Sequence, residues 1–377
     1  MPIKVVSIVS RMNLGGVAVL LSDLHESLTA PEFSHALITG VCAEDEVDVL
    51  DWTTEDQNIF QINTLGRAPS FLGDILTFIR IRKILKQLSP DIVHTHTSKA
   101  GVLGRLAAIS LQKNISVVHT YHGHHLYGYF SKFIVKLIAI VERLIAIKTD
   151  LLIADSTQVM EDLIKVRVGT KNEWRVIPPG VRSLRITSQE EARKILKVND
   201  INFLICWIGR FADIKNPMLA LTSYFEISAD SRKSMSMVMV GDGDLLEECR
   251  KYSEENNLHV IFPGWQSNVD TYLAAANVLL VTSKNEGFGM VIAEAGFFSI
   301  PCISTDVGGV REFINDGING VLTEASPEAI ANNLKKLYSD SGERNSLGLM
   351  AHETTLERFT VETFIRRHKE AYYALAK

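Results

Sequence analysis

The sequence predicts an α/β protein of two doubly wound domains, each with a parallel sheet covered by helices on both faces. Short runs rich in Val, Ile and Leu alternate with segments of helical pattern, and strands that are apolar throughout are typical of parallel sheets. This series occurs twice along the 377 residues, a length that exceeds the usual single hydrophobic core. A polar stretch without a strand signal, residues 182–199, lies between the two series and is expected to contain the domain boundary.

The predicted strands follow one another in regular alternation with helices. In the first half they are expected at residues 3–9, 36–39, 92–94, 117–119 and 151–154, with helices at 18–28 and 131–148. In the second half they are expected at 203–208, 235–240, 278–281 and 302–304, and Pro217 fits the first turn of a helix. We assign residues 1–182 to the first domain and 183–359 to the second. Ligands of such sheets bind beyond the carboxyl ends of the strands, so we expect a cleft lined by the loops of both domains.

The composition, 46% hydrophobic and 22% charged, is that of an ordinary globular protein. The apolar stretch at the start is too short for a signal peptide, and no apolar run reaches membrane-spanning length. The four cysteines show no metal-type spacing, as expected for free thiols in a reducing compartment, so we expect a cytoplasmic protein. The net charge is −5, yet residues 61–182 carry an excess of Lys and Arg, which suggests an anionic partner other than nucleic acid.

The most informative segment is the run Glu286-Gly-Phe-Gly-Met-Val-Ile-Ala-Glu294, in which a glycine turn opens into an apolar helix. A carboxylate before the turn can accept hydrogen bonds from sugar hydroxyls, and free N–H groups at the helix start can bind diphosphate oxygens. A carboxylate within the apolar helix must be paired or bound to a ligand, and a ribose diol is a suitable one. The alternative without a binding function is that one glutamate caps the helix and the other is an exposed helical acid.

Two further loops follow predicted strands and contain residues suited to phosphate. Gly15 and Gly16 allow close approach of a ligand to the backbone before a helix, although a tight turn alone also explains them. Gly209, Arg210 and Lys215 follow the first strand of the second domain, and the two cations can converge on one anion. The segment Gly241-Asp-Gly-Asp lacks the last glycine of a dinucleotide fingerprint, so an NAD site is not supported.

Histidines are concentrated in the first half near predicted strand ends, namely His94, His96, His119, His122, His124 and His125. Their spacing matches no standard metal pattern, so we expect no metal site. His122 is expected to point at a sugar, whereas His94 or His119 is expected to pack internally.

The segment 131–148 predicts an amphipathic helix with Lys132, Lys136 and Arg143 within about 40° of one another on one face. Such a face is either solvated or in contact with anionic lipid head groups or a lipid-linked diphosphate.

With these residues in place, the chain resembles the retaining glycosyltransferases of family 4, which have the GT-B architecture of two facing Rossmann-like domains and an interdomain cleft. The resemblance spans nearly the whole chain and is most specific at Glu286–Glu294, followed by Asp306-Val-Gly-Gly. The segments Asp91-Ile-Val-His-Thr-His and His119-Thr-Tyr-His-Gly-His are similar to the subset that builds bacterial surface polysaccharides.

The resemblance implies a role for each matching residue. Arg210 and Lys215 would bind the donor diphosphate and stabilise the leaving group, and Gly15, Gly16 and Gly209 would allow its close approach. Glu286 would bind hydroxyls of the transferred sugar, Glu294 would bind the ribose, and His122 would contact the sugar near its anomeric carbon. Phe288, Gly289 and Met290 would offer backbone N–H groups. By the same analogy, the helix at about 360–377 would pack back onto the first, acceptor-side domain.

The predicted function is therefore transfer of a hexose from a nucleotide-sugar, with UDP as the expected carrier, to a saccharide or polyprenyl-diphosphate-linked acceptor in surface polysaccharide synthesis. The nucleotide-sugar is a substrate, and no cofactor or metal is expected. The first alternative is a UDP-N-acetylglucosamine 2-epimerase, which would need acid/base carboxylates such as Asp91 or Asp155 in the first domain. The second is a catalytically silent protein that binds a sugar nucleotide. The sugar, the acceptor and the linkage do not follow from the sequence.

Overall fold

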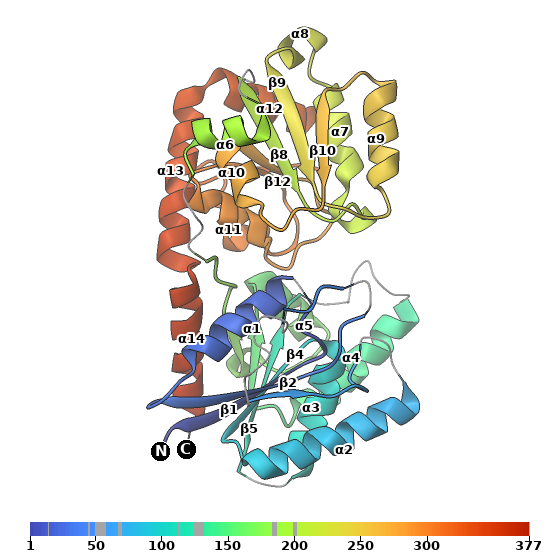
Figure 1. Cartoon of the computed structure of the whole chain (residues 1–377), viewed down its shortest axis with the longest axis vertical. Coiled ribbons are helices and arrows are strands. Elements are labelled where there is room, and N and C mark those ends of the chain that lie inside the picture. Colours follow the sequence, from blue (N-terminus) through green and yellow to red (C-terminus); the bar gives the residue numbers. More distant parts are fainter. Residues whose placement is uncertain are drawn as a thin grey trace. The chain divides into compact units, whose positions relative to one another are not determined.

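The computed structural model describes residues 1–13, 15–43, 46–49, 58–66, 70–111, 114–123, 132–182, 187–198 and 202–376. The chain divides into two compact units (Figure 1). Unit 1 comprises Met1–Gly180 and Val361–Lys377, and unit 2 comprises Val181–Thr360. The sequence placed the corresponding boundaries at 182/183 and at about 360.

Unit 1 contains a parallel sheet with strand order β3-β2-β1-β4-β5-β6-β7. Its strands are β1 (Ile3–Val9), β2 (Phe33–Thr39), β3 (Ile59–Gln61), β4 (Ile92–His96), β5 (Ser116–Tyr121), β6 (Leu151–Ala154) and β7 (Trp174–Val176). Its helices are α1 (Gly16–Ser27), α2 (Phe71–Leu88), α3 (Ser98–Ser110), α4 (Lys132–Ala146), α5 (Thr157–Lys165), the short η2 (Lys171–Glu173) and α14 (Val361–Leu375).

The C-terminal helix α14 belongs to unit 1 although it follows unit 2 in the sequence. Tyr372 is fully buried, and its hydroxyl lies 2.7 Å from Nδ1 of His94 on β4. Phe364 and Tyr372 share a hydrophobic cluster with residues of β1, β2 and α1. The helix therefore completes the covering of this sheet.

Unit 2 contains a second parallel sheet, with strand order β10-β9-β8-β11-β12-β13. Its strands are β8 (Phe203–Ile208), β9 (Met235–Val240), β10 (Val260–Gly264), β11 (Val278–Val281), β12 (Cys302–Thr305) and β13 (Val321–Thr323). Its helices are α6 (Gln189–Leu196), η3 (Asp213–Lys215), α7 (Pro217–Phe225), α8 (Ala229–Arg232), α9 (Leu246–Glu255), α10 (Asp270–Ala275), α11 (Met290–Phe297), η4 (Gly308–Glu312), α12 (Pro327–Ser339) and α13 (Ser341–Arg358).

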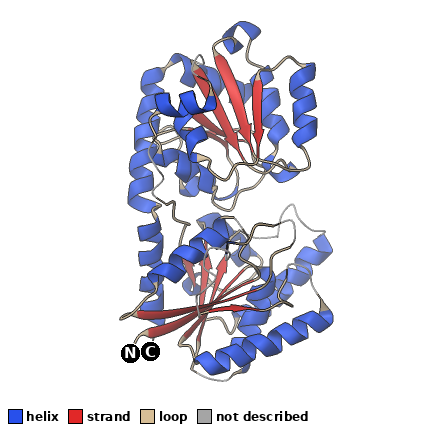
Figure 2. Ribbon diagram, viewed as in Figure 1, coloured by secondary structure: helices blue, strands red, loops and turns tan. Residues whose placement is uncertain are grey.

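Strand β8 shows why the central strands are apolar throughout. Phe203, Ile205 and Trp207 enter the hydrophobic cluster on one face of the sheet, whereas Leu204 and Cys206 enter the cluster on the other. Successive side chains of a strand point to opposite faces, so a strand covered on both sides needs apolar residues at every position. Figure 2 shows the strands of each unit as a layer between helices. The predicted fold class, two parallel α/β sheets, is confirmed.

All nine predicted strands are present, and the structure adds β3, β7, β10 and β13, which are the edge strands of the two sheets. Cys42, Cys206, Cys249 and Cys302 are free thiols, and all but Cys42 are buried, as the sequence predicted.

Candidate active site

The topology of unit 2 brings two predicted loops together. The strand order reverses between β8 and β11, because the chain continues from β8 to β9 and β10 on one side and from β11 to β12 and β13 on the other. The strands β8 and β11 are direct parallel neighbours, with Val278 opposite Ile205. Open parallel sheets bind ligands beyond the carboxyl ends of the strands at such a reversal. The loops that follow β8 and β11 are therefore the primary candidate site.

Glu286 and Lys215 form an ion pair at this position, although 71 residues separate them in the sequence. Nζ of Lys215 lies 2.5 Å from Oε1 of Glu286, and the hydroxyl of Ser283 donates to the same oxygen at 2.7 Å. The Glu286 side chain is 9% exposed. Both partners use Oε1, so Oε2 has no hydrogen bond with any residue that the structure describes and can accept one from a ligand.

Hydrogen bonds of Thr282 hold the two loops against each other. The hydroxyl of Thr282 donates to the carbonyl oxygens of Lys215 and Asn216 at 3.1 and 3.0 Å, and it accepts from Nε1 of Trp207 at 3.0 Å. The position of Lys215 is thus fixed through its backbone, independently of its side chain.

A third loop supports Glu286 from β12. The N–H of Gly309 donates to the carbonyl oxygen of Glu286 at 2.8 Å. Gly308 adopts φ +54°, and a Cβ at this position would lie 2.1 Å from the same oxygen. Only glycine fits here, because both the backbone conformation and the close approach exclude a side chain.

Arg210 is the second residue after β8, and its side chain is exposed. The preceding residue, Gly209, is in close contact with the loop that follows β9. A Cβ added to Gly241 in that loop would lie 1.9 Å from the Gly209 carbonyl oxygen. The described residues include no carboxylate paired with Arg210, so its guanidinium is available to an anion.

The N-terminus of α11 has unpaired N–H groups. Its N-cap is Gly289, in the left-handed conformation at φ 82°, which offers no side-chain oxygen to the first turn. The N–H of Ile292 bonds to the carbonyl of Gly289, whereas those of Met290 and Val291 have no acceptor among the described residues. Phe288 is buried and packs on Phe359, so only its backbone is available to a ligand. Such a helix start favours an anion.

Glu294 lies one turn further along α11, between buried Ala293 and Ala295. Burial, with a smaller contribution from the negative charge of Asp270, raises the pKa of its carboxyl to about 7. No donor or cation of the described residues pairs with this carboxylate. A carboxylate in apolar surroundings without a partner is suited to accept hydrogen bonds from a ligand, such as those donated by the hydroxyls of a ribose.

In unit 1 the strand order reverses between β1 and β4, and the predicted glycine loop follows β1. Gly15 is the N-cap of α1 and provides no side-chain cap, and both Gly15 and Gly16 are exposed. The preceding residue, Leu14, lies outside the described residues.

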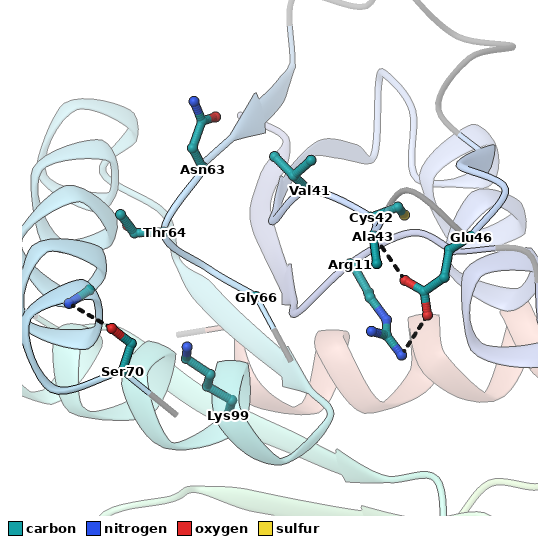
Figure 3. Close-up of a pocket in the computed structure, with 11 residues that line it drawn as sticks. Arg11, Val41, Cys42, Ala43, Glu46, Asn63, Thr64, Gly66, Ser70 and Lys99 are labelled. Atoms are coloured by element: carbon teal, nitrogen blue, oxygen red, sulfur yellow. Dashed lines mark hydrogen bonds and ion pairs between the residues drawn. The ribbon is translucent and has the colours of Figure 1, made fainter. Parts of the chain in front are cut away.

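A pocket of about 580 Å³ lies beside this reversal, at the carboxyl ends of β1, β2, β3 and β4 (Figure 3). Arg11 pairs with Glu46 at 2.9 Å, and Lys99 pairs with Asp74 at 2.6 Å. The remaining lining residues are small, polar or aliphatic, namely Val41, Cys42, Ala43, Asn63, Thr64, Gly66, Ser70 and Gly73. Charged pairs and an amide around a cavity of this size suit a hydroxyl-rich ligand.

The histidines of unit 1 form a largely buried group at the ends of β4 and β5. Both ring nitrogens of His94 have hydroxyl partners, Tyr372 and Thr120, and Nδ1 of His119 lies 2.8 Å from the Thr95 hydroxyl. Burial, followed by neighbouring positive or titratable groups, lowers the pKa values of His94, His96 and His119 well below the usual range.

His122 is the most accessible of the described members of this group. Its Nε2 lies 3.1 Å from Nδ1 of His96, and its Nδ1 lies 3.3 Å from Oδ2 of Asp155. No group of residues in the described part of the chain has the composition of a metal site. His124 and His125 lie outside the described residues.

The structure alters the basic face predicted on α4. Lys136 is exposed, but Nε of Arg143 donates to the carbonyl oxygen of Val166 and so points at the protein. The side chain of Lys132 lies outside the described residues. The predicted basic face of Lys132, Lys136 and Arg143 is therefore not confirmed, because Arg143 does not point away from the protein.

The sequence identified Lys215, Glu286 and the start of α11 separately, and the fold places them in one cluster. It did not identify Ser283, Asp270 or the pocket residues Arg11, Asn63 and Lys99. Ser283 lies in the loop already singled out, but the others follow strand ends without any distinctive local pattern.

Two family models match the chain and together cover most of it. The model described as Glycosyltransferase Family 4 matches residues 14–183, and the model described as Glycosyl transferases group 1 matches residues 188–353. The chain is a family 4 glycosyltransferase. The recognition from the motifs and the predicted enzyme class are thus confirmed.

Similar proteins include the UDP-Gal:alpha-D-GlcNAc-diphosphoundecaprenol alpha-1,3-galactosyltransferase of Escherichia coli, 29% identical over 90% of this chain and 88% of that protein. The capsular polysaccharide biosynthesis glycosyltransferase CapM of Staphylococcus aureus is 23% identical over 85% of this chain and 87% of its own. Among solved structures, Anabaena HepE in complex with UDP and glucose superposes with a TM-score of 0.81, at 20% identity over 99% of this chain and 100% of that one. This structural similarity confirms the GT-B fold.

Proposed function

We propose that this glycosyltransferase transfers a sugar from a UDP-sugar to a lipid-linked saccharide, with retention of the anomeric configuration, in the synthesis of a surface polysaccharide. The observation that carries the proposal is the Lys215–Glu286 pair beside the open N-terminus of α11. A cation, a carboxylate with a free oxygen, and unpaired N–H groups match the parts of a sugar diphosphate. The E. coli relative, which uses UDP-Gal and a diphosphoundecaprenol-linked sugar according to its name, supports the choice of donor and acceptor.

In the proposed reaction the bond between the anomeric carbon and the β-phosphate oxygen breaks, and a bond to the acceptor hydroxyl oxygen forms on the same face of the sugar. The proton of that hydroxyl passes to a phosphate oxygen of the departing UDP, so no protein base is needed. Negative charge grows on the diphosphate in the transition state. Arg210, Lys215 and the N-terminus of α11 would stabilise this charge, a task that many enzymes give to a metal ion.

The roles of the two glutamates differ in this scheme. Oε2 of Glu286 would accept a hydrogen bond from the transferred sugar, and Glu294 would bind the ribose. Gly15 and Gly16 would allow close approach of the diphosphate, and His122 would contact the sugar. The acceptor would occupy the pocket of unit 1, where the lining suits a hydroxyl-rich ligand. The lipid carrier of the acceptor implies work at the cytoplasmic face of a membrane. In the described part of the chain, no helix combines the length and the apolar character needed to cross a bilayer.

The proposal is tested by incubating the protein with a panel of UDP-, GDP- and ADP-sugars and an undecaprenyl-diphosphate-linked monosaccharide. We expect acceptor-dependent release of UDP and a disaccharide product whose new linkage, determined by NMR, has the anomeric configuration of the donor. A new nucleotide-sugar formed without acceptor would instead identify an epimerase. Nucleotide-sugar binding without turnover across the panel would identify a catalytically silent protein.

A further inference from the structure

Helix α2 exposes a continuous apolar stripe. Leu72, Ile75, Leu76 and Ile79 lie within about 100° of one another around the helix, and Phe71 lies at its first residue. Between 45% and 83% of the surface of each of these five side chains is exposed. Scattered exposed apolar side chains are ordinary, but a contiguous stripe of large ones marks a contact surface.

The same side of α2 becomes basic in its second half. Lys83 and Lys86 are exposed and continue the line of the stripe. The helix has one acid, Asp74, and its two oxygens bond to Lys99 and to the N–H of Ser70, so its charge is directed at the protein. The outward side of α2 is therefore apolar along its first half and cationic along its second.

Helix α4 repeats this pattern. Its exposed apolar residues follow one another at helical spacing, at Ile134, Leu137, Ile140 and Leu144, and Ile147 continues them just beyond its end. Lys136 and Lys148 are exposed beside them. The single acid of this helix, Glu142, is buried and pairs with Arg105 at 2.7 Å. The helix α3 contacts both α2 and α4, so the three helices lie next to one another in unit 1 (Figure 1).

We propose that α2, together with α4, docks unit 1 on the surface of an anionic phospholipid bilayer. The aliphatic side chains would enter the boundary between head groups and acyl chains, and the lysines would contact lipid phosphates. The charge distribution favours this occupant, because every acid of the two helices is turned inward and only cations face outward. A second copy of the chain would bring an equally basic surface against this one, which electrostatics disfavours.

The position of the pocket agrees with this surface. Ser70 and Gly73, at the start of α2, line the pocket, and Phe71 and Leu72 are exposed at the same end of the helix. A ligand in the pocket would thus lie next to the part of α2 that enters the bilayer. For the proposed lipid-linked acceptor, this places the sugar at the pocket while its chain stays in the membrane.

Sedimentation with vesicles tests the proposal without any substrate, so its outcome is independent of the transfer reaction. We expect the protein to bind vesicles of phosphatidylcholine mixed with phosphatidylglycerol, and to bind pure phosphatidylcholine more weakly. Leu76→Gln with Ile79→Gln should lower the partition coefficient at least about tenfold. Lys83→Gln with Lys86→Gln should lower it about 25-fold on the mixed vesicles, at about fivefold per lysine.

The matched control is Leu349→Gln with Leu356→Gln, which makes the same change at exposed leucines of α13 in unit 2. It should bind vesicles as the wild type does, and circular dichroism and thermal unfolding should show that all variants fold. Leu137→Gln with Leu144→Gln then measures how much α4 contributes to vesicle binding. The proposal is overturned if the wild type does not bind mixed vesicles, or if the α2 variants bind them unchanged. A wild-type dimer that Leu76→Gln with Ile79→Gln dissociates would equally overturn it in favour of a second copy.

Discussion

Replacing Lys215 by alanine should lower kcat by about 10²- to 10³-fold, which corresponds to about 2.7–4 kcal/mol of transition-state stabilisation. The substitution should remove the positive charge of Lys215 without displacing its loop. The Lys215 carbonyl still accepts from Thr282 at 3.1 Å, so the loop keeps its position without the side chain. Glu286 loses one of the two donors to Oε1 and keeps the hydroxyl of Ser283. An interaction made mainly in the transition state should reduce kcat and kcat/KM in similar proportion.

The chain provides a matched control in the same pair of loops. Nζ of Lys284 lies 2.5 Å from Oδ1 of Asp213, the same distance as between Lys215 and Glu286. In this second pair, however, the lysine side chain is 48% exposed and the aspartate side chain 84%. Exposed ion pairs contribute about 0–1 kcal/mol, so Lys284→Ala should change kcat by less than about fivefold. The assay is UDP release at saturating donor and acceptor, below the unfolding temperature of each variant. A Lys215→Ala enzyme within about fivefold of the wild type, or an equal loss in Lys284→Ala, would refute the assigned role.

Four other predictions follow from the same site. Arg210→Ala should lower kcat by about 10²-fold with unchanged thermal stability, and wild-type turnover would remove this residue from the mechanism. Burial raises the pKa of Glu294 to about 7, so its ionised form, which only accepts hydrogen bonds, appears as the pH rises through 7. The affinity for UDP-sugar, measured by calorimetry, should therefore increase over this pH range. In Glu294→Gln the affinity should not depend on pH over the same range. An equally steep profile in that variant would contradict the ribose role. Gly317→Ala, at φ 72° and with nothing within 4 Å of the added Cβ, should show only the backbone cost of about 1–3 kcal/mol in urea unfolding. Gly308→Ala should cost more than this, because its Cβ would also clash with the Glu286 carbonyl oxygen, and it should raise the donor KM. Activity should persist in EDTA, and a requirement for stoichiometric zinc would overturn the metal-free mechanism.

The central strands of both sheets could be predicted from the sequence, and the edge strands could not. Central strands such as β8 are covered on both faces, so an uninterrupted apolar run identifies them. The four edge strands have 3 to 5 residues, and most of their positions are only partly buried or exposed; β3 and β10 contain no buried residue. Such short mixed segments cannot be told from loops by pattern alone.

The site could be predicted in its parts but not in its assembly. The motif around Glu286 and the cations after β8 are local signals, because strand ends and glycine turns leave a pattern in the sequence. That Lys215 pairs with Glu286 depends on β8 lying beside β11, a contact between distant segments that no local pattern encodes. The pocket of unit 1 depends likewise on four strand ends, and its residues are individually unremarkable.

The ion pair also favours one of two functions for Glu286, substrate positioning over proton transfer. A catalytic acid or base must expose its reacting oxygen to the proton it transfers and change its protonation state during turnover. Oε1 of Glu286 instead accepts from a cation and a hydroxyl at once, in a loop fixed by Gly308 and Gly309. Protonation of this carboxylate would remove the negative charge that pairs with Lys215, whereas a hydrogen bond from a sugar hydroxyl to Oε2 would keep that charge. Glu286 is therefore suited to set the position of the transferred sugar relative to Lys215, and the departing diphosphate remains the proton acceptor in the proposed reaction.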